Sequence, residues 1–142
     1  MKISTKGRYG TRFMLELAIS PKDRPVTIKE AAENQRISEK YLEQIIPSLK
    51  KSGLIRSIRG SHGGYGLDKA PEAISVGMIL TALEGPLAPV DCVLHLDNRD
   101  SSAVAFCDNM PCCVTIDIWK KVYDAVHQVV DNITLADLAA QY

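Results

Sequence analysis

Four cysteines are the residues of this chain with the most distinctive chemistry. Cys92, Cys107, Cys112 and Cys113 all fall in one segment of weak periodicity, residues 90–113. Thiolates are the usual ligands of iron–sulfur clusters, because soft sulfur suits iron and shares the charge of the cluster. A redox disulfide between two of these cysteines is an alternative, and inert thiols are the simplest interpretation. Zinc is disfavoured because the segment has no Cys-x-x-Cys pair.

A second group of residues with a physical role lies in residues 55–67. Two short apolar-alternating runs flank a tip that is rich in glycine and carries two basic residues, a pattern that predicts a β-hairpin. Without side-chain bulk, the backbone of this tip can approach another polymer closely. Arg59 is the candidate for a minor groove, since a guanidinium fits a narrow A·T-rich stretch. Gly60 and His62 are also predicted to contact DNA. The alternative is a surface hairpin with a purely structural role.

Two short helices are predicted directly before this hairpin. Thr27 and Glu30 have the spacing of a capping box, which opens the first helix. Ser38 caps the second helix, predicted over residues 39–52, in which Pro47 predicts a kink or a tightened end. A helix-turn-helix followed by a basic hairpin with a glycine tip is a winged helix, the architecture of a DNA-binding regulator.

The second helix of a helix-turn-helix enters the major groove with its N-terminal residues. Gln44 is placed to bond an adenine edge, and Glu43 either accepts from cytosine N4 or is a solvated helix charge. Tyr41 is favoured as a core residue, whereas basic and hydroxyl side chains are expected to hold phosphates, which contribute affinity rather than sequence choice. The predicted DNA-binding residues are Lys2, Lys6, Arg8, Thr27, Ser38, Glu39, Lys40, Tyr41, Glu43, Gln44, Arg59, Gly60 and His62.

Charge is distributed unevenly along the chain. Residues 1–69 hold 14 Lys and Arg against 7 Asp and Glu, whereas residues 70–142 hold 3 against 10. A basic half suits a polyanion such as double-stranded DNA. The start of the chain has no apolar signal segment, and no run approaches the roughly 20 apolar residues of a membrane helix, so a cytoplasmic protein without a membrane partner is expected. No nucleophile–base constellation or phosphate-binding glycine loop is present, so an enzyme is not expected.

The remaining predicted helices include one suited to dimerisation. The first helix is expected over residues 9–20, and another begins after the cap Ser75. Residues 114–132 form a long helix whose wide apolar stripe favours a homodimer; packing onto the first helix of the same chain is the alternative. The fold class is therefore mainly α with a small β-hairpin wing. Three parts are predicted: a winged helix-turn-helix domain (1–85), a cysteine-bearing sensor loop (86–113), and a dimerisation helix with a C-terminal helix (114–142).

Three stretches of the chain resemble one family. Residues 1–10, 38–44 and 58–65 are similar to the Rrf-type winged-helix transcription regulators, and the resemblance continues to Leu83-Glu84-Gly85-Pro86 and the tail from Asn132 to Leu135. This family includes the iron–sulfur regulator IscR, the nitric-oxide sensor NsrR and the cysteine-metabolism repressor CymR. The resemblance implies a dimeric bacterial regulator with the long helix at the dimer interface.

The resemblance also implies a ligand set, from which the chain departs in part. Cluster-binding members have three cysteines here, the last two separated by five residues, which matches Cys92, Cys107 and Cys113. Their fourth ligand is a histidine where this chain has Ile116, or an N-terminal aspartate where it has Arg8. The remaining candidates for that ligand are Cys112, His95, Asp91 and Asp97.

Two functions follow from these observations. The leading hypothesis is a regulator that senses an iron–sulfur cluster or redox state, with [2Fe–2S] favoured over [4Fe–4S]. The alternative is a cluster-free regulator of cysteine or sulfur metabolism that responds to a partner protein or to thiol oxidation.

Overall fold

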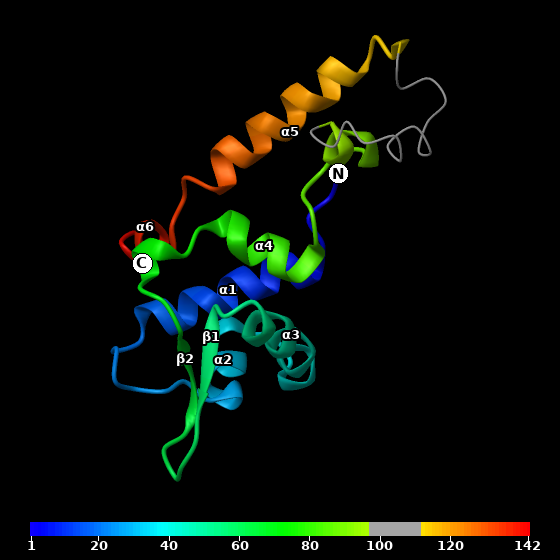
Figure 1. Ribbon diagram of the computed structural model, residues 1–142. Helices are drawn as coiled ribbons and strands as arrows, with labels where there is room; N and C mark the ends of the chain where they lie inside the picture. The colour runs from blue at the N-terminus through cyan, green and yellow to red at the C-terminus, as the bar shows by residue number, and fades with distance from the viewer. Residues whose placement is uncertain (97–111) are drawn as a thin grey trace.

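A computed structural model of the protein describes residues 1–96 and 112–142 (Figure 1). That part of the chain is mostly helical and carries one two-stranded antiparallel sheet, which confirms the predicted fold class. In chain order the elements are α1 (Thr5–Ile19), α2 (Ile28–Gln35), α3 (Glu39–Lys51), β1 (Ile55–Ile58), β2 (Gly64–Leu67), η1 (Pro71–Ala73), α4 (Val76–Glu84), η2 (Asp91–His95), α5 (Ile116–Val130) and α6 (Leu135–Ala139).

Hydroxyl side chains begin five of the six α-helices in the described residues. Each accepts a hydrogen bond from the backbone N–H three residues later, which satisfies one of the free donors at a helix start. Because Ser4 is one of these caps, α1 begins a turn earlier than the sequence predicted. The caps are Ser4, Thr27, Ser38, Ser75 and Thr134.

One capping box forms at α6, whereas the one predicted at α2 forms only in part. Thr134 and Asp137 bond each other reciprocally, and the bonds from the backbone and side chain of Thr134 lower the pKa of the Asp137 carboxyl. Thr27 accepts from the backbone of Glu30, whereas the Glu30 carboxylate pairs with Arg24 instead. The first α2 turn is therefore tied to the loop before it.

The core is one cluster centred on α1. Helices α2, α3, α4 and α6 all contact α1, and the side chains of Phe13 and Met14 are fully buried among them. Leu135 of α6 is also fully buried in this cluster, so the C-terminal helix returns to the winged-helix body. Helix α3 continues through Pro47 and buries the stripe formed by Leu42, Ile45, Ile46 and Leu49.

The hairpin is fixed to the body at its base. Strand β1 pairs with β2 in the register Ile55 with Leu67 and Ile58 with Gly64, and Tyr65 forms a bridge to Val26 on the other edge of β2. The ring of Tyr65 meets the ring of Phe13 edge-on, with 6.4 Å between centroids. The wing therefore leaves the core at a position set by buried aromatic contacts.

Helix α5 projects from this body (Figure 1). It contacts η2 and α4, but none of its residues is buried. Its C-terminal end is anchored by backbone hydrogen bonds from Val76 to Ile133 and from Leu135 to Ile74, with donor–acceptor distances of 2.8 and 2.9 Å. The predicted stripe is thus only partly covered by its own chain.

The cap of α3 gives a direct test of these local assignments. Replacing Ser38 with Ala removes the acceptor for the Tyr41 backbone N–H, and we expect the free energy of unfolding to fall by about 1 kcal/mol. Ser61→Ala is the control, since no side-chain bond is recorded for Ser61 within the described residues. Equal unfolding midpoints of the two variants in urea would contradict the cap.

Candidate nucleic-acid interface and cysteine segment

The N-terminal half of α3 presents a polar face. Glu39, Lys40, Glu43 and Gln44 are exposed, while the apolar residues between them face the core. Ser38 is the helix cap, so its hydroxyl is already bonded to the backbone. Tyr41 is half-buried and meets Tyr9 edge-on at 5.4 Å between centroids, which agrees with the core interpretation of this residue.

A buried polar network holds the turn before this helix. The Glu16 carboxylate, only 4 % exposed, accepts from the side-chain amides of Asn34 and Gln35, both at 2.7 Å. Arg12 donates to the Gln35 side chain and to its backbone carbonyl. Arg36 follows with φ +53°, the left-handed conformation that ends α2. Buried polar groups such as Glu16 and Gln35 cost free energy unless they are paired, so this network ties the C-terminal turn of α2 to α1.

The sequence analysis missed this network. Glu16 lies three residues after Phe13, on the core-facing side of the first helix. A carboxylate at such a position was the signal in the sequence that a buried polar partner was needed. Its partners Asn34 and Gln35 are too distant in sequence for periodicity to pair them with it.

The wing tip carries residues that the sequence predicts to contact DNA, and their side chains make no hydrogen bond within the described residues. Arg59, Gly60 and His62 are exposed, and Gly60 has φ +126°, which a side chain would strain. Gly63 allows the chain to fold back, because a Cβ there would lie 2.4 Å from the carbonyl oxygen of Ile58. The tip is therefore a bare turn bearing one guanidinium.

The remaining predicted residues lie at two helix starts. Lys2 precedes α1, and Lys6 and Arg8 lie in its first turns, where Arg8 donates to Thr5 at 3.3 Å. Thr27 is exposed at the start of α2, as its cap. All of these side chains lie on the basic half of the chain.

The cysteine segment lies beside the start of α5. Cys92 is half-buried in η2, Cys112 is exposed, and Cys113 is half-buried two residues before Thr115. The Thr115 hydroxyl lies 3.2 Å from the Cys113 sulfur, and this contact, with the Thr115 backbone, lowers the pKa of that thiol. Cys107 and Asp97 lie outside the described residues.

The fit to an iron–sulfur cluster can be tested on the donors that are placed. Within residues 1–96 and 112–142, no group of three or more His, Cys, Asp and Glu side chains lies close enough to hold a metal ion. Ile116 begins α5 and carries no donor, and Arg8 is engaged with Thr5. The described residues therefore do not assemble a cluster site.

A membrane-spanning segment is not found either. Among the described helices, none combines the length and the apolar composition that crossing a bilayer requires.

Comparison with known proteins identifies the family. A family model described as "Rrf2: Iron-dependent Transcriptional regulator" matches residues 3–141. The chain belongs to the Rrf2 family of transcriptional regulators.

Individual Rrf2 members are similar along nearly the whole chain. The HTH-type transcriptional regulator CymR of Bacillus subtilis is 41 % identical over 99 % of this chain and 91 % of its own length. The solved structure of CymR, titled the global cysteine regulator of B. subtilis, covers 100 % of this chain and 98 % of that one, with 39 % identity and a TM-score of 0.78. A structure of T. potens IscR covers 99 % and 88 %, with 39 % identity and a TM-score of 0.76. These relatives are regulators rather than enzymes, as the sequence predicted.

The role proposed for the wing can be tested by mutation. Arg59→Ala is expected to weaken binding to a specific DNA site by about 1–3 kcal/mol and to relax discrimination there, because one minor-groove guanidinium is lost. Lys6→Ala should weaken binding to all sequences alike. Fluorescence anisotropy at fixed salt measures both, with Lys121→Ala of α5 as the control. Unchanged affinity of the Arg59 variant would remove the wing from the interface.

Proposed function

We propose that this Rrf2 protein is a homodimeric DNA-binding repressor or activator of cysteine or sulfur metabolism that responds to thiol oxidation. The observation that carries the proposal is the likeness to CymR, which spans 99 % of this chain at 41 % identity. The sequence alone favoured the cluster sensor over the cluster-free regulator, whereas the likeness to CymR favours the cluster-free regulator.

DNA binding is supported by charge and geometry together. Exposed polar residues at the start of α3 and an exposed guanidinium at the wing tip lie on the basic half of the chain. In a winged helix these two elements are the ones that reach base edges and the adjacent minor groove. Lys2, Lys6 and Arg8 are proposed to hold phosphates, which adds affinity without sequence choice.

Dimerisation is supported by the division of the α5 stripe. Tyr123, Val126 and Val130 are half-buried, whereas Ile118, Trp119, Val122 and Val129 are 36–58 % exposed. Apolar faces of this width on a projecting helix mark an interaction surface. A second α5, related by a two-fold axis, would cover the exposed side because a C2 interface is self-complementary.

The dimer helix can be tested with one charge. Val122→Glu would bury an unpaired carboxylate in the proposed interface, so we expect the dimer to dissociate at micromolar concentration. Lys121→Glu changes its exposed neighbour outside the stripe and should leave the dimer intact. Sedimentation velocity distinguishes these outcomes, and a dimeric Val122 variant would exclude this surface.

The cysteines that precede α5 are proposed to sense the oxidant. Two thiols of one chain would be oxidised by hydrogen peroxide: the sulfur–sulfur bond forms, the O–O bond breaks, and the peroxide takes both electrons and both protons and leaves as two waters. Cys113 is proposed as one partner because it lies at the start of α5, the helix that contacts the Cys92-bearing η2. A new bond there would change the angle at which α5 leaves the body.

A cluster sensor is the second candidate function. The description of the family as iron-dependent and the likeness to T. potens IscR favour it. Cys92, Cys107 and Cys113 are the proposed ligands, with Cys112 as the fourth, and [2Fe–2S] is favoured over [4Fe–4S].

One preparation separates the two candidates. Protein purified without oxygen is expected to be colourless and nearly iron-free, and peroxide is expected to consume two thiols per chain and change DNA affinity. Cys113→Ser should abolish both peroxide effects. A brown protein with stoichiometric iron and sulfide, bleached by Cys92→Ala, would establish the cluster sensor instead.

A further inference from the structure

A cavity lies at the base of the wing, and none of the residues that line it comes from α3. Its volume is about 340 Å³, at the lower end of the range typical of small-molecule sites. Leu17 and Ala18 of α1 line one wall, and β2 together with the chain just after it lines the other. Segments separated by nearly fifty residues thus close around one space.

Basic side chains surround this cavity. Lys22, Arg24, Arg56 and Lys69 all line it, against a single carboxylate, that of Asp23. Arg24 is occupied by Glu30, but the other three have no ion-pair partner among the described residues. Unpaired cations that converge on an apolar floor form a site for a charged head and an apolar body.

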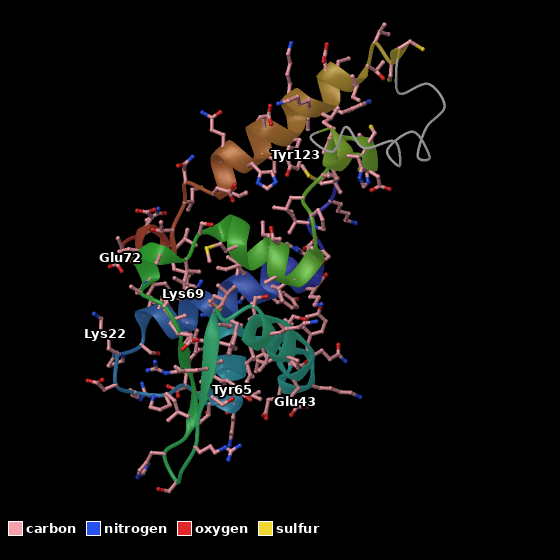
Figure 2. All side chains as sticks on the ribbon, in the orientation of Figure 1. Lys22, Glu43, Tyr65, Lys69, Glu72 and Tyr123 are labelled. Carbon is pink, nitrogen blue, oxygen red and sulfur yellow. The ribbon has the colours of Figure 1, made fainter. Side chains whose placement is uncertain are left out.

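DNA reading does not account for these cations. In Figure 2, Lys22 lies on the opposite side of the two wing strands from Glu43 of α3, and Lys69 lies at the end of β2. A duplex that contacts the exposed face of α3 approaches the wing from the Glu43 side. The basic cluster around the cavity is therefore available to another anion.

We propose that this cavity binds a small organic anion, a short apolar body that ends in a phosphate or carboxylate. Lys22 and Lys69 would contact the anionic head from opposite sides, and Arg56 would add a planar donor. Leu17 and Ala18 would contact the apolar body. Because β2 forms one wall and α1 the other, an occupied cavity would add a contact between the wing and the body and so couple the ligand to DNA affinity.

The test uses hexyl phosphate as the probe, with hexanol and inorganic phosphate as its two halves. Amide chemical shifts of the full-length protein are followed in a titration by two-dimensional NMR. Hexyl phosphate should shift the signals of residues 17–24 and 65–71 in a saturable way. Hexanol alone and inorganic phosphate alone should each bind at least about tenfold more weakly, since hexanol lacks the charge and phosphate lacks the apolar contact.

The charged lining is tested by variants. The double change Lys22→Glu and Lys69→Glu should weaken hexyl phosphate binding at least about tenfold, while Lys29→Glu, an exposed charge reversal on α2 outside the cavity, should not. Absence of saturable shifts, or equal binding to both variants, would overturn the proposal. So would a double variant that loses DNA affinity as strongly as Arg59→Ala, because the cations would then belong to the DNA interface.

Discussion

The close approach of α1 and α4 is the constraint on which the rest of the molecule depends. A Cβ at Gly10 would lie 2.1 Å from a methyl carbon of Leu83, and one at Gly7 would lie 2.0 Å from a carboxylate oxygen of Glu84. The space left by these two glycines lets Glu84 accept from both the backbone and the side chain of Ser4, at 2.9 Å each. Side chains at either position would separate the helices, with the cost that overpacking carries.

This contact links the two parts of the chain to which functions are proposed. Helix α1 contacts α2 and α3, which position the polar face proposed to read DNA, and α4 leads directly to η2 and the cysteine segment. Helix α6 returns to α1 after α5, so the C-terminal end of α5 is held by the same body. A change in the cysteine segment can therefore act on α5 while the body keeps its shape, as a two-state switch requires.

Local structure was predictable because its causes are local. A hydroxyl residue at the start of a helical pattern identifies a helix start, and Ser38 and Ser75 were both predicted as caps in this way. The hairpin was likewise predicted from its glycine-rich tip and the apolar runs beside it. The pairing of Glu16 with Gln35, the division of the α5 stripe and the cavity beside Lys22 and Lys69 all depend on segments distant in sequence. No periodicity in a single segment contains that information.

A symmetric pair of winged helices is proposed to read DNA. The most direct test is a hydroxyl-radical footprint of the protein on duplexes selected from a randomised pool. The account predicts two related protected tracts, separated by about one helical turn or a multiple of it, with minor-groove protection where each wing lies. Failure to enrich any sequence, or a single asymmetric tract at concentrations where the protein is dimeric, would contradict it.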